Sequence, residues 1–320
     1  MVSDMGLQEV GPNQLVGRSI AIAGGGLIGV SWGALFAHHG ARVVLWDPMS
    51  EARVLAVRRF GDAAAQLTEI CPPNASGTFD ISDSLDRTLE GAELVQENAP
   101  EAIETKRDLY RKIESLIPET TIVASSTSAL TWSDLSPGLR VPERFVTAHP
   151  FNPPHLLPLV ELYGIDSSVL DRAEALYRGA GRVPVRLRKD ATGHIANRLS
   201  SALWREAVHI VADGIADVAA VDTALINGPG LRWATVGAHM AYHLGGGEGG
   251  LASYLEHLGP SQERRWADLG NPQLDDETKA MLVEGANASA DGRDLGTLAA
   301  GRDAALISML RARRDVEGER

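Results

Sequence analysis

The stretch Arg18–Asp47, RSIAIAGGGLIGVSWGALFAHHGARVVLWD, decides the fold of this chain. Ser19–Ala23 is a short apolar run typical of a buried strand, and the glycine-rich turn Gly24–Gly29 follows it directly. An apolar helical stretch then leads to a second apolar run, Arg42–Trp46, which ends at Asp47. The order of strand, glycine turn, helix, strand and acid is the one found in dinucleotide-binding βαβ units.

The residue types in this stretch predict that the chain binds NAD. Gly24 allows a tight turn, Gly26 lets the backbone approach a pyrophosphate, and Gly29 lets the helix pack closely on the strand. The helix N-terminus offers unpaired N–H groups to phosphate, and Asp47 can bond the ribose hydroxyls of NAD while repelling the extra phosphate of NADP. An ordinary structural turn is the alternative interpretation. The predicted cofactor contacts here are Gly24, Gly26, Leu27, Ile28, Gly29 and Asp47.

Composition limits the classes of protein to consider. The chain has 320 residues, 44% of them hydrophobic and 22% charged, which is typical of a globular protein of about two domains. A net charge of −12 argues against nucleic acid or an anionic membrane as a partner. Residues 1–16 look like a loose leader without a secretory signal pattern, and no apolar run is long enough to cross a membrane. We therefore expect a cytoplasmic protein.

The rest of the chain divides into two regions. Strand-like runs alternate with helical stretches up to about residue 190, which predicts an α/β domain with a Rossmann-type, doubly wound and mostly parallel sheet. From Gly193 onward the patterns are helical only. We therefore expect an NAD-binding domain over residues 1–190 and an all-α domain for substrate binding and dimerisation over 191–320. The predicted later strands are 92–96, 121–124, 145–148, 158–163 and 183–187.

His149 is the candidate general base. It ends a strand-like run in the segment AHPFNPPH, and Glu161 lies in the apolar run Leu159–Leu162. A carboxylate among apolar residues is unfavourable unless it is paired, and a His–Glu pair would resolve that and fix the imidazole tautomer. A hydrogen-bonded core histidine and a glutamate on a solvated strand face are the alternatives.

Several ordered motifs extend this interpretation. Ser125–Ser128, His149–Pro153, Leu159–Glu161 and Gly193–Arg198 follow the turn GGGLIG in sequence. Together they resemble the 3-hydroxyacyl-CoA dehydrogenase superfamily, and the resemblance runs from about residue 18 to residue 260. The resemblance implies NAD as cofactor and a homodimer.

The resemblance also implies a role for individual residues. His149 corresponds to the catalytic base and Glu161 to the carboxylate that orients it. Ser128 corresponds to the serine that bonds the substrate oxygen, and Asn197 to the asparagine that completes this site. A helix N-cap at Ser128 and a surface position at Asn197 are the alternatives. Further implied contacts are Asn152 in the catalytic loop and Glu97 and Ser126 on the cofactor side.

The C-terminal region resembles two related branches of the family. The segments Gly228–Ala234, Tyr242–Leu244 and Gly246–Gly250 resemble the carnitine dehydrogenase branch and the related L-gulonate 3-dehydrogenase and lambda-crystallin branch. Both dehydrogenase branches act on small free 3-hydroxy acids. A 3-hydroxyacyl-CoA dehydrogenase stays an alternative, because arginines in 48–91 could hold phosphates. A crystallin-like structural protein and an NAD-binding sensor are alternatives of another class.

Aromatic and basic residues give a candidate substrate site. Phe151, Trp233 and Tyr242 could form an aromatic wall for a quaternary ammonium group, and core packing is the alternative. Arg198 or Arg232 could meet a substrate carboxylate, with a structural ion pair as the alternative.

Two further features concern metals and assembly. His239 and His243 have the i, i+4 spacing of helical metal ligands but lack the companion residues of that motif, so we expect no metal. Apolar helix faces in residues 190–320 predict a homodimer.

Overall fold

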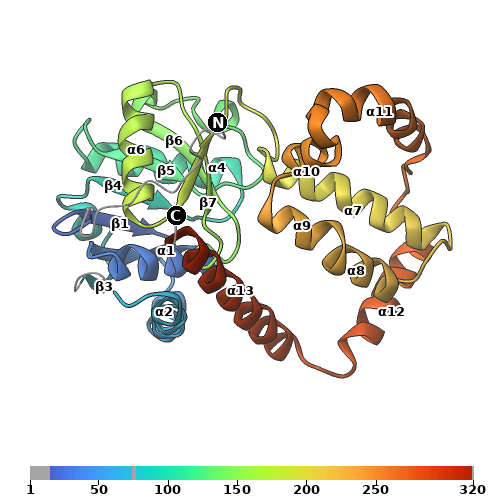
Figure 1. Cartoon of the computed structure of the whole chain (residues 1–320). Helices are drawn as coiled ribbons and strands as arrows, with labels where there is room; N and C mark the ends of the chain where they lie inside the picture. The colour runs from blue at the N-terminus through green and yellow to red at the C-terminus, as the bar shows by residue number, and fades with distance from the viewer. Residues whose placement is uncertain (1–14, 74–76, 319–320) are drawn as a thin grey trace. The chain divides into compact units, whose positions relative to one another are not determined.

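The computed structural model describes residues 15–73 and 77–318 of the chain. Most of the predicted leader, residues 1–14, lies outside the described residues. Eight strands form one sheet in the order β3-β2-β1-β4-β5-β6-β7-β8 (Figure 1). Neighbouring strands are parallel except for the antiparallel pair β6–β7. The strands are β1 Ser19–Ala23, β2 Arg42–Trp46, β3 Thr78–Ser82, β4 Leu94–Glu97, β5 Ile122–Ser125, β6 Phe145–Pro150, β7 Leu159–Tyr163 and β8 Val183–Arg186.

Helices cover both faces of the sheet, because alternate strand residues point to opposite sides. Ile20 and Ile22 of β1 pack in a core with α1, α2 and α6. Ala21 and Ala23 face the other core, with α3, α4 and α5. This arrangement confirms the predicted doubly wound, mostly parallel α/β fold. The helices are α1 Leu27–His38, α2 Ser50–Ile70, α3 Leu85–Leu89, α4 Ile103–Leu116, α5 Trp132–Leu135 and α6 Ser167–Gly179.

The carboxyl ends of parallel strands lie at one edge of the sheet, where open α/β sheets bind ligands. β1 runs into the glycine turn, β5 runs into the loop that carries Ser128 (the serine loop), and β6 ends at His149-Pro150. The antiparallel register then places Glu161 of β7 directly opposite His149. The topology therefore collects the motifs of the first domain at one edge.

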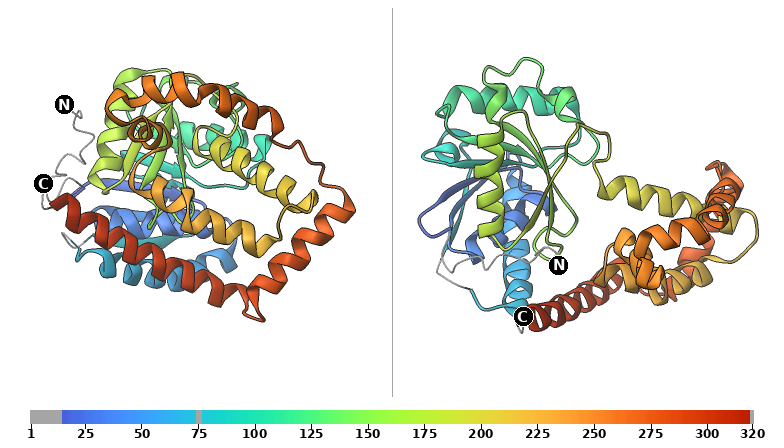
Figure 2. Two further views of the ribbon diagram at one scale, coloured as in Figure 1. Left: turned by 45° about the vertical axis from the view of Figure 1, so that its right-hand side comes forward. Right: turned by 45° about the horizontal axis from the view of Figure 1, so that its top comes forward.

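The remaining helices confirm the predicted all-α C-terminal region and are coloured yellow to red in Figure 2. The chain forms two compact units. The first contains the sheet and consists of the described residues up to Arg198 together with those from Gly301 onward, and the second is Leu199–Ala300. Residues 229–245 form two short helices, which are separated at Val236-Gly237. These helices are α7 Ala196–Ala212, α8 Val218–Asn227, α9 Pro229–Thr235, α10 Ala238–Gly245, α11 Gly250–Asp268, α12 Asp276–Ala290 and α13 Leu295–Gly318.

The chain from Gly301 lies beside α2 (Figure 2). Gln66 of α2 donates to Asp303 over 3.2 Å, and Arg314 donates to the carbonyl oxygen of Ile70 over 3.1 Å. No helix in the part of the chain that the structure describes is both long and apolar enough to cross a membrane.

Candidate active site

The glycine turn has the geometry that a dinucleotide requires. Gly24 has φ +114°, a conformation that L side chains rarely adopt. A Cβ at Gly29 would lie 1.9 Å from the carbonyl oxygen of Gly24, so only glycine allows this close packing of α1 on the turn. A Cβ at Gly26 would meet no protein atom within 4 Å and would instead occupy the space in front of the helix.

The N-terminus of α1 faces that open space without a side-chain cap. Gly26 is the N-cap residue and makes no capping bond. The N–H groups of Leu27 and Ile28, in the first turn, have no intrahelical partner and suit a phosphate. The residues of the turn therefore fit a bound NAD, with the pyrophosphate at the start of α1.

Asp47 is held at the end of β2, beside the glycine turn. Its Oδ2 accepts the N–H of Gly25 at 2.7 Å, and its Oδ1 accepts the N–H of Met49 at 2.8 Å. The guanidinium of Arg53 donates to the Asp47 carbonyl oxygen over 2.7 Å. Each carboxylate oxygen can accept a second hydrogen bond, so Asp47 is oriented but still available to ribose hydroxyls.

His149 and Glu161 form a buried pair. His149 Nδ1 lies 2.8 Å from Glu161 Oε2, and the two residues are 4% and 1% exposed. Glu161 Oε1 accepts the N–H groups of Ile195 and Ala196, at 2.7 and 2.9 Å, where α7 begins. Burial opposes ionisation of Glu161, but these bonds outweigh it and hold the pKa of the carboxyl below its ordinary value. The pair can orient a neutral imidazole and stabilise an imidazolium.

Ser128 and Asn197 come together beside this pair. Asn197 Nδ2 donates to the carbonyl oxygen of Ser128 over 3.2 Å. Ser128 does not cap a helix, because Thr131 is the N-cap of α5. Its side chain is exposed at the loop after β5, and its hydroxyl makes only a long hydrogen bond, donating to Glu101 Oε1 over 3.4 Å.

Glu101 shapes the loop that carries Ser128, and sequence reasoning missed it. Its Oε1 accepts the N–H groups of Ser128 and Ala129, both at 2.8 Å, and the hydroxyl of Thr127 at 2.6 Å. Burial by itself raises the pKa of this carboxyl. These hydrogen bonds and the charge of Lys106 together outweigh burial and lower the pKa to about 2. The loop is therefore folded around a fixed negative charge, a role for which the sequence carries no motif.

Two predicted cofactor contacts are corrected by the structure. Glu97 has 0% exposure, and its carboxylate accepts bonds from Lys106, Tyr110 and Ser125 at 2.9, 2.6 and 2.7 Å. Its side chain therefore supports the core under the site and is not available to a ribose. The hydroxyl of Ser126 is likewise fully used by protein partners, namely Trp32, Gln96 and Asn98.

The candidate substrate residues fall into both compact units. Phe151 is half-buried, its ring centre 6.3 Å from that of His149, and Asn152 and Arg198 are exposed in the same unit. Arg232, Trp233 and Tyr242 belong to the other unit, where Tyr242 packs on Tyr254 with ring centres 4.9 Å apart. The aromatic wall and the carboxylate-binding arginines stay predictions.

His243 makes a hydrogen bond within the helical unit. Its Nδ1 accepts the N–H of Leu251 at 3.1 Å, at the start of α11. Among the residues that the structure describes, no group of three or more His, Cys, Asp and Glu side chains could hold a metal ion.

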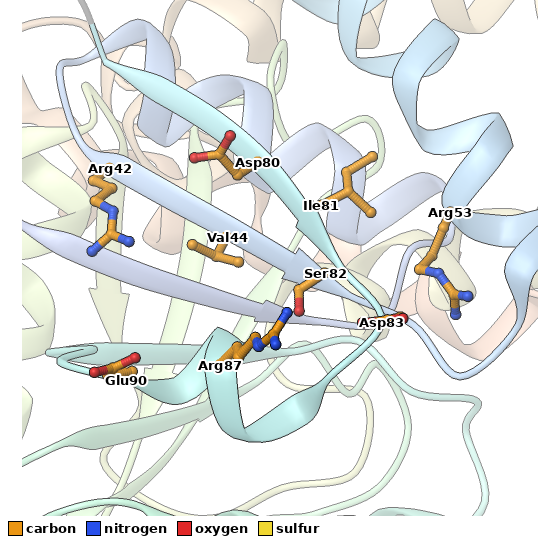
Figure 3. Close-up of a pocket in the computed structure, with 9 residues that line it drawn as sticks. All are labelled: Arg42, Val44, Arg53, Asp80, Ile81, Ser82, Asp83, Arg87 and Glu90. Carbon is orange, nitrogen blue, oxygen red and sulfur yellow. The ribbon is translucent and has the colours of Figure 1, made fainter.

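A cavity of about 630 Å³ is lined by residues of β2, α2, β3 and α3 (Figure 3). Figure 3 shows Arg87 pointing from α3 toward Ser82, at the end of β3. Three guanidiniums and three carboxylates line the cavity, so the charges balance. The charged lining residues are Arg42, Arg53, Arg87, Asp80, Asp83 and Glu90.

Known proteins share these features across most of the chain. Residues 19–191 match the NAD-binding domain of 3-hydroxyacyl-CoA dehydrogenase, and residues 193–275 match its C-terminal domain. An L-carnitine dehydrogenase from Nocardiopsis dassonvillei is 40% identical, over 94% of this chain and 93% of its own length. One from Streptomyces coelicolor is also 40% identical, over 92% of this chain and 94% of its own.

Solved structures agree with this relationship. The structure of 5-formyl-3-hydroxy-2-methylpyridine 4-carboxylic acid 5-dehydrogenase, an NAD+-dependent dismutase, is 31% identical with a TM-score of 0.81, over 94% of this chain and 99% of that one. The 3-hydroxybutyryl-CoA dehydrogenase of Escherichia coli K12 has 25% identity and a TM-score of 0.62, over 84% of this chain and 57% of that one. As the ordered sequence motifs predict, the chain belongs to the 3-hydroxyacyl-CoA dehydrogenase family and is an NAD-dependent dehydrogenase.

Proposed function

We propose that this enzyme oxidises the 3-hydroxyl of a small free 3-hydroxy acid to the 3-oxo acid, with carnitine as the first candidate substrate. The observation that carries the chemistry is the buried His149–Glu161 pair, whose carboxylate is fixed by the start of α7. The choice of carnitine is supported by relatives that carry the name L-carnitine dehydrogenase. A sugar acid of the gulonate type is the second candidate, on the resemblance of residues 228–250.

His149 is the base in this proposal. Its Nδ1 is held by Glu161, which leaves Nε2 to accept the proton of the substrate hydroxyl. The Glu161 carboxylate stabilises the imidazolium that results. NAD, when bound, supplies the acceptor for the hydride that leaves the substrate carbon. In the reverse direction the protonated His149 returns its proton to the oxygen.

Ser128 and Asn197 hold the substrate oxygen in this proposal. The Asn197 amide is bonded to the Ser128 carbonyl, so the two residues form one preorganised element. Preorganised donors stabilise charge that develops on an oxygen without reorganising during the reaction.

The cavity over β2 and β3 bears on the acyl-CoA alternative. Phosphates of a CoA tail need a net positive site. Arg53 and Arg87 line this cavity together with Asp80, Asp83 and Glu90, so these two arginines do not form an anion-selective pocket. This balance favours a free acid over a CoA thioester.

The homodimer is part of the proposal and rests on the helical unit. Helices α8, α9 and α10 contain no buried residue. Ile226, Leu231 and Leu244 are 66%, 58% and 63% exposed, an apolar surface that association with a second copy would cover. Sedimentation at micromolar concentration is expected to give twice the chain mass of 34.1 kDa, and a monomer would contradict it. The cytoplasmic location and the functional boundary near residue 190 stay predictions.

A substrate panel tests the proposed function. NADH formation is followed with carnitine, gulonate, 3-hydroxybutyrate and 3-hydroxybutyryl-CoA at matched concentrations. The proposal expects turnover of a free acid well above that of the thioester. Turnover of the thioester alone would replace the proposal with the acyl-CoA alternative.

A further inference from the structure

His194 has a backbone conformation that is rare for its residue type. Its φ is +49°, in the left-handed region, and it follows Gly193 at φ +74°. A non-glycine residue in this region carries a local energetic penalty, so the surrounding structure must impose it. The next two residues, Ile195 and Ala196, point their N–H groups at Glu161. The unusual turn at His194 therefore delivers the donors that fix the carboxylate.

The His194 side chain contacts the same site. It is 1% exposed, and its ring centre lies 4.8 Å from that of His149 with an interplanar angle of 36°. Its Nε2 lies 3.3 Å from the carbonyl oxygen of Thr127, the residue before Ser128. Its Nδ1 is buried and has no hydrogen-bond partner among the described residues. One side chain thus touches the base and the serine loop.

The charge state of His194 follows from this environment. Burial is the largest cause that lowers its pKa, and the nearby His149 lowers it further. The Thr127 carbonyl, Glu161 and Asp190 act in the opposite direction but do not reverse the shift. His194 is therefore neutral at neutral pH, with an uncharged ring against His149.

We propose that His194 is a positioning residue for His149, a role that rests on the proposed function. The His194 ring packs on the imidazole of His149 and keeps that imidazole in the orientation that hydrogen-bonds to Glu161. It also stabilises the imidazolium that forms when the substrate loses its hydroxyl proton. A cation next to an aromatic face is favourable, and a second neutral ring supplies that face. The proton stays on Nε2 of His149, and His194 neither gains nor loses one.

Two variants separate the ring from the hydrogen bond. His194→Asn tolerates the left-handed backbone but has no ring, and His194→Phe keeps the ring but loses the donor to Thr127. Each is assayed for kcat and KM with the best panel substrate and NAD, for NAD affinity by fluorescence and for thermal midpoint. The controls are His149→Ala, and His257→Asn at an exposed position on α11.

The inference expects a specific pattern. His194→Asn lowers kcat roughly tenfold, with KM and NAD affinity near those of the wild type, and lowers the thermal midpoint because a buried ring is lost, whereas His194→Phe restores most of kcat. Wild-type kcat in His194→Asn would overturn the role, and so would equal losses in both variants. A loss only in His194→Phe would assign the effect to the Thr127 bond or to the left-handed backbone, and would also overturn the role of the ring. If the wild type is active and His149→Ala is not, the proposed function holds, and a failure at His194 then overturns only the positioning role. If the wild type shows no turnover, both the proposed function and the positioning role are overturned.

Discussion

His149 and Glu161 are register partners across the antiparallel strands β6 and β7, and their side chains meet at 2.8 Å. The other strand pairs of the sheet are parallel, so this reversal is what brings a residue of the following strand opposite the end of β6. The N–H groups at the start of α7 then donate hydrogen bonds to the other carboxylate oxygen of Glu161. Three segments of the chain, namely β6, β7 and the start of α7, thus hold the imidazole of His149 in place.

Replacing Glu161 with Gln is expected to lower kcat by roughly 10², because the imidazolium loses its partner charge while the side-chain shape is kept. NAD affinity should be unchanged, since the glycine turn does not contact this pair. Steady-state kinetics and NAD titration check both. The control is Glu174→Gln, a surface carboxylate paired with Arg178 and Arg186. A Glu161→Gln enzyme with normal kcat would remove Glu161 from the proton-transfer machinery.

Asp47→Asn tests the discrimination between NAD and NADP. The amide oxygen can still accept the N–H of Gly25, but the negative charge is gone. We expect weaker NAD binding, by about tenfold, and a smaller preference over NADP, because the repulsion of the extra phosphate disappears. Asp83→Asn, one strand further along, is the matched control. Equal use of both cofactors by the wild type would refute the role of Asp47.

Much of the sheet could be predicted because its central strands are apolar runs. β1 and β2 have the predicted bounds, since both are buried between helices. β3 was not predicted: it lies at the sheet edge, where Thr78 and Asp80 are exposed, so no apolar run marks it. α6 was also not predicted, although Asp166 caps its start and signals a helix.

The candidate active site could be predicted only where the type of a residue and its sequence context indicate its chemistry. A strand-end histidine followed by a glutamate in an apolar run predicts a pair, and the structure buries that pair. Glu97 was misplaced because its burial depends on Lys106 and Tyr110 of α4, a contact that no sequence pattern encodes. His194 was missed for a similar reason, because its partners come from the loop after β5 and from β6.

Trp233→Ala tests recognition of the substrate head group. If Trp233 contacts a trimethylammonium group, its loss should raise KM for carnitine about tenfold and leave KM for a sugar acid, which has no cationic group, nearly unchanged. Trp233 is 36% exposed, and Trp266 of the same unit, 61% exposed, supplies the control Trp266→Ala. Equal effects of Trp233→Ala on both substrates would make Trp233 a packing residue.

Stability is expected to fall in mild acid because buried histidines stay neutral in the folded state. Burial is the largest cause that lowers the pKa of His155, from 6.5 to about 4. Below pH 6.5 the unfolded chain binds this proton and the folded chain does not, so the free energy of unfolding decreases as the pH falls from 6.5 toward 4. Well above pH 6.5 both states are neutral, and His155 contributes no pH dependence there.

Urea unfolding at two pH values measures this contribution. Between about pH 7.5 and about pH 5.5, His155 should account for about 1.4 kcal/mol of lost stability, which His155→Gln removes. The control His257→Gln, at an exposed position, should lose as much stability as the wild type. The same loss in His155→Gln as in the wild type would contradict the assignment.

The most direct test of the account is the initial rate of NADH formation from carnitine by the wild type and by His149→Ala. The account predicts turnover by the wild type and a rate lower by roughly 10²–10⁴ in His149→Ala, the usual scale for loss of a general base, with NAD affinity retained. A His149→Ala enzyme that oxidises the substrate at a rate near that of the wild type would contradict it.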